Sequence, residues 1–302
     1  MNSQPRITVG IPAFNEAQNI GELLRQIFAQ KVTLGILCEV LVVSDGSSDD
    51  TAEIVRSYRD SRLRLIDRKE RIGLNGTQNE IVSQVVGDVL VILNADVLLK
   101  SDRFIDEIIE PLLEDDRVGL VGADTVSVLP RTWFESVVVF SHKLKTKIYQ
   151  DINQGDTVYL CHGRARAFSR EIYSRIVWPG ACPEDAYSYL FCVSRGRTFK
   201  YAKRAQVLFR APTTLRDYIK QSQRFARGKR LLVGYFNPSF VRRVHLIPRW
   251  RAFRLILRYF MIDPLRTSSY GCIFVIGQLF FKESAANDLR YEVSPSTKKL
   301  IS

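Results

Sequence analysis

The sequence GDVLVILNADVLLK, residues 87–100, joins a short apolar run to a polar end. Five successive apolar residues, Val89 to Leu93, are followed by Asn94-Ala95-Asp96. An unbroken apolar run of this length predicts a strand that is buried on both faces. Its end offers an amide and a carboxylate separated by one residue. Asn and Asp are also common turn residues, so the rest of the chain must decide between a simple turn and a functional site.

The first 125 residues alternate strand-like and helix-like patterns. The strand-like runs are residues 7–11, 39–44, 63–67, 89–93 and 118–123. This alternation predicts an α/β fold, with a mostly parallel central sheet and helices on both faces. In such sheets ligands bind beyond the carboxyl ends of the strands. Residues 12–16, 45–46 and 94–96 should therefore lie along one edge and form a site.

Beyond residue 125 the regular alternation stops. Residues 130–150 and 213–233 have helical patterns, residues 183–193 predict a short helix, and residues 158–169 suggest paired short strands. Asn237-Pro238 is the best boundary signal. We therefore expect a catalytic domain over residues 1–236 and a helical extension over residues 237–302.

The extension contains an uncharged apolar stretch, residues 267–281, which is 15 residues long. As a helix it would span ~22 Å, which is less than the ~30 Å hydrocarbon core of a bilayer. Together with RWRAFRLILRYF, residues 249–260, it fits an amphipathic anchor at a membrane interface. A helix pair packed on the catalytic domain is the other interpretation.

Positive charge is concentrated in one part of the chain. Of a net charge of +12, residues 195–258 hold 18 Lys or Arg against one acid, Asp217. Such a block favours an anionic partner, namely nucleic acid, acidic lipid or a phosphorylated substrate. The chain carries no recognised nucleic-acid motif, so we expect an anionic membrane surface and no nucleic acid as partner.

Two features bear on the cellular compartment. The five cysteines are scattered and form no C-x-x-C pair, which is typical of reduced thiols. The first ten residues contain no apolar run of the kind found in secretory signals. We expect a cytoplasmic protein bound peripherally to the inner face of the cell membrane.

The polar strand ends have the chemistry of a nucleotide and metal site. Glu16 and Asp45 can accept hydrogen bonds from a base or a ribose. Asp96 is a hard oxygen ligand suited to Mg²⁺ or Mn²⁺, and such an ion would neutralise a departing diphosphate. The pair Glu184-Asp185 supplies a carboxylate that could act as a general base.

Five motifs together resemble those of the inverting family 2 glycosyltransferases. They are GIPAFNEAQNI, VVSDGSSDDT, NAD, PED and QSQRF, in the family's order and rough spacing over residues 6–233. The resemblance implies the GT-A nucleotide-diphospho-sugar transferase fold. It also implies a nucleotide-sugar donor, above all a UDP-sugar, and a glycan or lipid-linked hydroxyl as acceptor. Synthesis of cell-surface polysaccharide or glycolipid would be the pathway class.

The resemblance assigns a role to each matching position. Donor-nucleotide contacts fall to Pro12, Glu16, Asp45, Arg71, Asn79 and Asn94. Acceptor or diphosphate contacts fall to Glu184, Gln221, Arg224 and Phe225. The last three match the Q-x-x-R-W motif of polysaccharide synthases and ceramide glucosyltransferases. Asp96 would bind the metal and Asp185 would be the catalytic base.

The sequence departs from the family pattern in two places. Asn94 stands where the first Asp of the D-x-D signature is usual, which predicts weaker metal binding. Phe225 replaces Trp, which keeps the ring and loses the indole donor. The multi-span membrane region of processive synthases is also missing, so we expect a single addition and no polymerisation.

Two alternatives remain open. A polyprenyl-phosphate sugar synthase shares the fold, but its anionic acceptor needs no base, so Asp185 and Arg224 argue against it. A non-catalytic module that binds nucleic acid or membrane would have no use for Asp96 and Asp185. His162-Gly163 lies where the family has a donor-sugar loop, and a structural histidine is equally consistent with the sequence.

Overall fold

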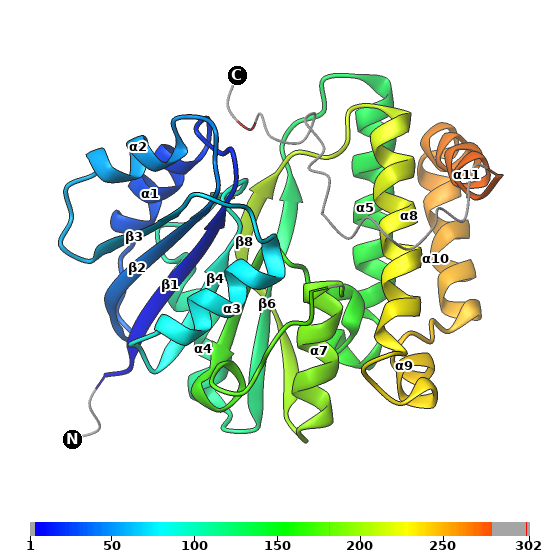
Figure 1. Cartoon of the computed structure of the whole chain (residues 1–302). Helices are drawn as coiled ribbons and strands as arrows, with labels where there is room; N and C mark the ends of the chain where they lie inside the picture. The colour runs from blue at the N-terminus through cyan, green and yellow to red at the C-terminus, as the bar shows by residue number, and fades with distance from the viewer. Residues whose placement is uncertain (1–3, 181, 280–299, 301–302) are drawn as a thin grey trace.

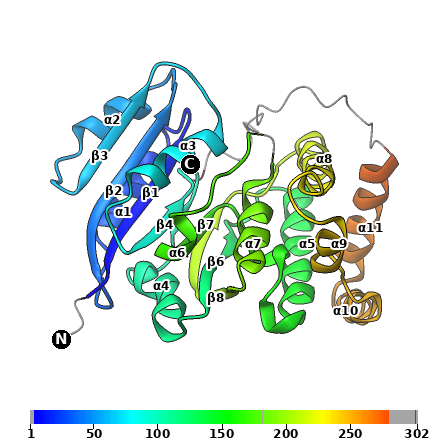
Figure 2. The ribbon, with the colours of Figure 1, turned by 60° about the horizontal axis from the view of Figure 1, so that its bottom comes forward.

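The computed structural model describes residues 4–180, 182–279 and 300 (Figure 1). One eight-stranded sheet, in the order β3-β2-β1-β4-β7-β6-β8-β5, runs through the molecule. Helices cover both of its faces, and the C-terminal helices gather at one end (Figures 1 and 2). The predicted α/β fold, with a mostly parallel central sheet and helices on both faces, is confirmed.

The N-terminal half of the sheet is parallel. β1 (Arg6–Ala13) pairs with β2 (Ile36–Asp45) and with β4 (Val89–Leu93), and β2 pairs with β3 (Leu63–Arg68). The helices that connect them are α1 (Ile20–Phe28), α2 (Thr51–Ser57) and α3 (Leu74–Gln84). Parallel strands that are joined by helices end at the same edge, so the loops after β1, β2 and β4 meet there.

The alternating side chains of β4 enter two separate cores. Val89, Val91 and Leu93 pack in the cluster that includes α1 and α4 (Phe104–Glu114). Leu90 and Ile92 pack in the cluster on the opposite face. The strand is therefore buried on both faces, as its unbroken apolar run predicts.

The prediction of paired short strands at residues 158–169 is wrong. This segment forms a 3-10 turn, η2 (Val158–Leu160), and then a single strand, β7 (Ala165–Ser169). β7 lies antiparallel between β4 and β6 (Val118–Ser127). The partners of β7 are far away in sequence, so local patterns could not identify them.

The far part of the sheet depends on a long strand that the sequence did not predict. β8 (Thr198–Phe209) runs parallel to β6 and also pairs with the two-residue β5 (Leu98–Leu99). Its charged residues obscure the strand pattern, because Lys203 and Arg204 interrupt it where the register with β6 shifts. Irregular pairing of this kind is typical of a β-bulge.

The remaining elements are mostly helical. They are α5 (Trp133–Gln150), η1 (Asn153–Gly155), α6 (Arg170–Tyr173), α7 (Glu184–Ser194), α8 (Leu215–Leu232), α9 (Pro238–Val244), α10 (Arg249–Ile262) and α11 (Pro264–Leu279). Thr132 and Glu135 form a capping box at the start of α5, and Thr214 caps α8. Ser and Thr caps satisfy backbone N–H groups that a helix start leaves open.

The C-terminal helices pack on α5 and α8 (Figure 2). The Phe140 and Tyr259 rings meet at 5.5 Å, and Tyr270 and Ile273 pack beside Tyr218. The domain boundary at residue 237 stays a prediction. Of the apolar stretch 267–281, the last two residues lie outside the described residues. Within the part of the chain that is described, no helix has both the length and the apolar character needed to cross a membrane.

Candidate functional site

The loops after β1 and β2 are hydrogen-bonded into one surface. The backbone N–H of Asn15 donates to Ser47 Oγ at 3.1 Å, and the N–H of Ser48 donates to Asn15 Oδ1 at 2.8 Å. The N–H of Glu16 donates to Thr51 Oγ1 at 2.7 Å. Asn15 has a positive φ of 54°, a conformation that Asn tolerates better than most residues. The PAFNE and DGSSDDT motifs therefore form a single structural unit.

Glu16 lies in this unit with its side chain largely enclosed. It is 8% exposed, and one carboxylate oxygen accepts a hydrogen bond from Asn19 Nδ2 at 2.9 Å. Pro12 is buried in β1, opposite Val43 of β2. Both residues lie where the loops meet, as predicted for the donor nucleotide.

Asp45, at the end of β2, is buried and organises the loop before α3. One of its carboxylate oxygens accepts from the N–H of Ile72 at 2.9 Å and the other from the N–H of Gly73 at 2.8 Å. A carboxylate that accepts two backbone N–H bonds fixes the loop in place. Its predicted contact with the nucleoside is not tested by these bonds and stays a prediction.

That loop carries Arg71 across the loop after β1. The Arg71 guanidinium carbon lies 3.9 Å from the centre of the Phe14 ring. The close approach requires Gly46, which has a φ of +68°, because a Cβ there would lie 2.9 Å from the Arg71 nitrogen. Arg71 thus lies at the predicted edge, beside the PAFNE loop.

Asn79 points to a different part of the molecule. Its amide exchanges two hydrogen bonds of 2.8 Å with the backbone of Trp178, and Asn75 Nδ2 donates to the carbonyls of Pro179 and Cys182. Both amides therefore tie α3 to the segment before α7. The donor contact that the sequence suggested for Asn79 stays a prediction, and the structure adds this structural role.

Asp185 lies at the start of α7, next to Glu184. Gly163 makes room for both, since a Cβ at Gly163 would collide with Glu184 Oε1. Burial, and then the charge of Glu184, raise the pKa of Asp185 to about 6. Arg166 and Arg224 lower it, so both guanidinium groups lie within electrostatic reach of this carboxylate. A carboxylate with a raised pKa is a better proton acceptor near neutral pH.

Arg166 holds the start of α7 in position. This fully buried side chain donates to the carbonyl of Glu184 at 3.0 Å and to Ser188 Oγ at 2.7 Å. It also donates to Gln78 Oε1 of α3 at 3.2 Å. An arginine in an otherwise apolar strand is the signal that could have identified this anchor, and the sequence interpretation missed it.

Helix α8 packs closely against the segment that carries the acids. A Cβ at Gly228 would lie 3.0 Å from Pro183 Cγ, so the helix and the PED motif are nearly in contact. Of the three motif residues on α8, Gln221 is half-buried, while Arg224 and Phe225 are exposed. The structure thus brings the helix that carries the Q-x-x-R-F motif close to the PED segment, and the binding role of the motif stays a prediction.

Asn94 and Asp96 follow β4 at the same edge, and both are half-buried. The N–H of Asn94 donates to the carbonyl of Arg164 at 2.9 Å. Asn94 Oδ1 is buried and has no hydrogen-bond partner among the residues that the structure describes. An unpaired buried oxygen needs a partner, and a cation or a bound ligand could supply it.

The protein offers few ligands for a metal ion at this edge. Within residues 4–180, 182–279 and 300, no group of three or more His, Cys, Asp and Glu residues could hold one. Mg²⁺ is commonly held by one or two protein oxygens, with phosphates and water completing its octahedron. The Asp96 carboxylate and the orphaned Asn94 oxygen fit that kind of site, in which the diphosphate must contribute.

Two further residues from the loop before β7 lie near these groups. The Arg164 guanidinium lies over the Phe209 ring at 3.8 Å, and burial lowers its pKa, whereas the charges of Asp96 and then of Asp185 and Glu184 raise it. Burial and Arg164 lower the pKa of His162 to about 3. His162 is therefore a neutral imidazole, and Arg164 supplies the positive charge at this point of the loop before β7.

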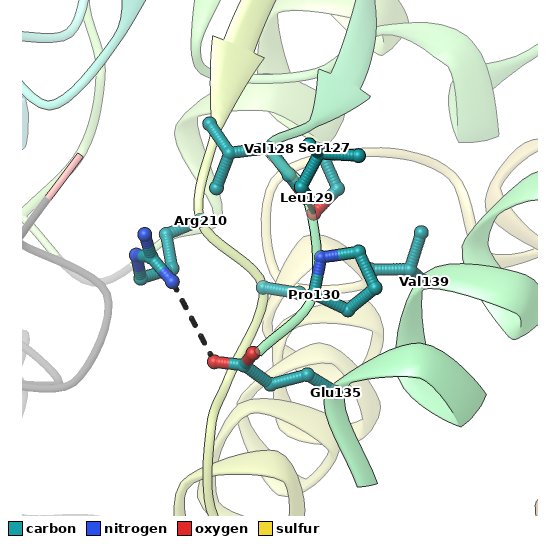
Figure 3. A pocket seen from close by; sticks show the side chains of 8 residues that line it. Ser127, Val128, Leu129, Pro130, Glu135, Val139 and Arg210 are labelled. Carbon is teal, nitrogen blue, oxygen red and sulfur yellow. Dashed lines mark hydrogen bonds and ion pairs between the residues drawn. The ribbon is translucent and has the colours of Figure 1, made fainter. Parts of the chain in front are cut away.

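A small hollow near the ends of β6 and β8 is a structural feature (Figure 3). Glu135 and Arg210 face each other there at 3.6 Å, and both are nearly buried. Glu135 also accepts from the N–H of Thr132 in the capping box of α5. The hollow therefore lies where the ends of β6 and β8 meet the start of α5.

The comparisons with known proteins agree with this arrangement. The model of the family described as Glycosyl transferase family 2 matches residues 8–177, which is more than half of the chain. A poly-beta-1,6-N-acetyl-D-glucosamine synthase of Staphylococcus aureus is 26% identical over 256 residues, or 80% of this chain and 59% of that protein. An undecaprenyl-phosphate 4-deoxy-4-formamido-L-arabinose transferase of Klebsiella pneumoniae is 33% identical over 95 residues, covering 30% of this chain and 29% of that protein. The chain spans less than two thirds of either relative.

Solved structures show the same fold. A mannosyltransferase from Pyrobaculum calidifontis, in complex with GDP-Man and Mn²⁺, superposes with a TM-score of 0.63 at 21% identity. The match covers 92% of this chain and 82% of that one. A glucosyl-3-phosphoglycerate synthase from Mycobacterium tuberculosis gives 0.51 at 18% identity over 74% and 78% of the two chains. With the family model matched over more than half of its length, the chain belongs to glycosyl transferase family 2.

Proposed function

We propose that this chain is an inverting glycosyltransferase that moves a sugar from a nucleotide-diphospho-sugar to a hydroxyl group. The observation that carries the proposal is that Asp96, Asp185 and Arg224 all lie within electrostatic reach of the Arg164 guanidinium group, which lies over the Phe209 ring. Asp96 lies in the loop after β4, Asp185 in α7 and Arg224 in α8, and each belongs to a separate motif. In this proposal Asp96 would be the metal ligand, Asp185 the base and Arg224 an acceptor-side group.

The donor is proposed to lie over the loops after β1 and β2. Pro12, Glu16 and Asp45 would contact the nucleoside there, with Arg71 beside it. UDP-sugars are the favoured donors on the basis of the sequence motifs. The mannosyltransferase with the same fold binds GDP-Man, so the test below includes guanine nucleotides.

The ion would be Mg²⁺ or Mn²⁺, held by Asp96 and Asn94 together with the diphosphate. When bound, it would neutralise charge on the departing diphosphate. This assignment is supported by the buried, unpaired oxygen of Asn94 and by the Mn²⁺ in the mannosyltransferase.

Asp185 would take the proton from the acceptor hydroxyl. As that oxygen attacks the anomeric carbon, a new C–O bond forms, the bond from the anomeric carbon to the β-phosphate oxygen breaks, and the nucleoside diphosphate leaves with the bonding electrons. Attack opposite the leaving group inverts the configuration, so an α-linked donor gives a β-linked product. A base with a pKa of about 6 is largely ionised at neutral pH and still accepts a proton effectively.

The acceptor is proposed to be a glycan or a lipid-linked sugar in cell-surface polysaccharide or glycolipid synthesis. The relative from Staphylococcus aureus supports this class, because that match spans 80% of the chain. The relative that acts on undecaprenyl phosphate matches over 30% only. A polyprenyl-phosphate acceptor is therefore the second candidate, since it would leave Asp185 without a function.

An anionic membrane surface is proposed as the docking partner of α10. This helix carries Arg249, Arg251, Arg254 and Arg258 and no acid. Its Trp250, Phe253, Leu257 and Met261 side chains are at least half exposed. Aromatic and aliphatic groups interleaved with arginine suit the interface of an acidic bilayer, on which the enzyme would be peripheral.

A donor screen tests the proposal. The chain is incubated with Mn²⁺ and UDP-glucose, UDP-N-acetylglucosamine, UDP-galactose or GDP-mannose, and release of nucleoside diphosphate is measured with short glycans, polyprenyl phosphate or water as acceptor. We expect release from at least one donor, stimulated by a hydroxyl acceptor. Release that polyprenyl phosphate alone stimulates would favour the second candidate, and absence of release and of nucleotide binding would contradict both.

A further inference from the structure

Arg164 lies directly across from Asn94 at the edge of the sheet. β4 and β7 are antiparallel, with Leu93 opposite Ala165, and the Asn94 N–H donates to the Arg164 carbonyl at 2.9 Å. Residues opposite each other in an antiparallel pair have Cβ atoms about 5 Å apart. The Arg164 side chain therefore begins next to Asn94, whose amide stands where the family usually has the first carboxylate.

The surroundings of Arg164 restrict its side chain and bring its charge near those of the acids at this edge. The guanidinium carbon lies 3.8 Å from the centre of the Phe209 ring, a stacking contact that restricts the planar group. Its charge interacts most strongly with Asp96, and then with Arg224, Asp185 and Glu184. Arg164 is thus the cation between the metal-side acid and the acids of α7.

Arg166, two residues further along and inside β7, shows what a structural arginine looks like. The terminal nitrogens of Arg166 make three hydrogen bonds, to Glu184, Ser188 and Gln78. For Arg164, in contrast, no hydrogen bond or ion pair to the guanidinium occurs within the described residues. A guanidinium group has five N–H donors, and the half-buried Arg164 pairs none of them within the described residues. The donors of Arg164 are available for a ligand.

We propose that Arg164 binds the diphosphate of the donor directly and supplies part of the positive charge that family members draw from a metal on two carboxylates. The inference rests on the proposed function and adds a residue to it. Arginine forms paired hydrogen bonds with phosphate oxygens, which gives both charge and orientation. A site with one carboxylate, one amide and a fixed guanidinium depends less on the metal. Nucleoside diphosphate should therefore bind measurably without metal.

The test is a set of dissociation constants measured by calorimetry on the full chain. UDP and UMP, and in parallel GDP and GMP, are titrated into the wild type, Arg164→Gln and Arg164→Lys, in EDTA and in Mn²⁺. Arg62→Gln is the matched control, because Arg62 also lies over an aromatic ring, Phe28, at 4.9 Å and is remote from this edge. Thermal unfolding of each variant checks that it folds.

We expect Arg164→Gln to weaken diphosphate binding in EDTA by ~10-fold or more, the usual effect of losing a hydrogen bond to a charged group. Monophosphate binding should change less than threefold, and Arg62→Gln should bind like the wild type. Arg164→Lys should show an intermediate loss, because it keeps the charge and loses the paired geometry. If Arg164→Gln fails to fold, the lysine variant decides by the same comparison.

Equal losses for diphosphate and monophosphate, or no loss for diphosphate, would overturn the inference, because Arg164 would then act only on local structure or not at all. Those outcomes leave the proposed function intact as long as the wild type binds diphosphate with Mn²⁺. A wild-type chain that binds neither UDP nor GDP with Mn²⁺ would contradict the proposed function and the inference together.

Discussion

Asp96 and Asp185 lie in different electrostatic environments, which suits two different tasks. Asp96 follows β4, and of the charged groups around Arg164 it interacts most strongly with the Arg164 guanidinium. Asp185 shares the start of α7 with Glu184, and burial with that second acid raises its pKa to about 6. The raised pKa of Asp185 suits the exchange of a proton, whereas Asp96 is proposed as an oxygen ligand for a metal.

The first prediction concerns the metal. Asp96→Ala should reduce transfer by ~10²-fold or more, because the carboxylate ligand of the ion is lost. Asn94→Asp should keep activity and lower the Mn²⁺ concentration needed for half-maximal rate, since a second carboxylate strengthens the site. Initial rates across a Mn²⁺ titration measure both effects. Full activity of Asp96→Ala in EDTA would show that Asp96 holds no catalytic metal.

The second prediction concerns pH. The ionised form of Asp185 is the active base, so kcat/KM should fall as the pH drops through about 6 and level off above it. Asp185→Asn should lower kcat by ~10²-fold or more while donor binding survives, and it should remove this acid limb. Glu184→Gln should shift the limb to lower pH, because Glu184 helps to raise the pKa of Asp185. An unchanged acid limb in Asp185→Asn would assign the titration to another group.

At the scale of elements, the sequence predicted what depends on local pattern and missed what depends on distant partners. β4 and the strands before it follow from apolar runs and turn residues. β7 pairs with both β4 and β6, and β8 pairs with β6 across a register shift, with Lys203 and Arg204 at the surface. The pairing of β7 and β8 therefore depends on strands that are far away in the sequence. The motif residues were found because their side chains carry chemistry. Arg164 and Arg166 were missed because basic residues at the start of a strand are ambiguous in sequence.

The third prediction concerns the position of α8. Gly228→Ala should lower the free energy of unfolding by about 1 kcal/mol and reduce turnover severalfold, because the new Cβ would press on Pro183 at 3.0 Å. Gly271→Ala is the control: it lies in α11, has nothing within 4 Å of its new Cβ and should stabilise the chain by about 0.5–1 kcal/mol. Denaturant unfolding and initial rates measure both. Equal stabilisation by the two substitutions would mean that the contact between α8 and Pro183 leaves room for a Cβ at position 228.

At the scale of the whole molecule, the C-terminal helices have two sides. Tyr259 and Tyr270 face α5 and α8, which favours the packed helix pair that the sequence left open. Phe253 is 68% exposed and Met261 76% on the other side of the same region. Packing on one side of the C-terminal helices leaves their other side exposed. The packed helix pair and the membrane-interface anchor are therefore compatible interpretations of the apolar stretch.

The fourth prediction is salt-sensitive binding of the chain to acidic vesicles. Vesicles with one third phosphatidylglycerol should bind it at low salt and release it as salt rises, because each arginine near the surface contributes about 1 kcal/mol. Phe253→Glu should weaken binding ~10-fold or more, and Leu129→Glu, at a still more exposed apolar residue after β6, should not. Co-sedimentation measures these effects. Equal binding to neutral and acidic vesicles would contradict an electrostatic surface.

The stereochemistry of transfer tests the central claim most directly, and it needs no identified acceptor. An α-linked nucleotide sugar that the chain turns over is incubated with Mn²⁺ and water as the acceptor, and the anomeric proton of the released sugar is followed by NMR before mutarotation. Inversion through a base such as Asp185 predicts that the β-anomer appears first, and that Asp185→Asn releases it ~10²-fold more slowly. An α-anomer as the first product, or release at the wild-type rate by Asp185→Asn, would contradict the account.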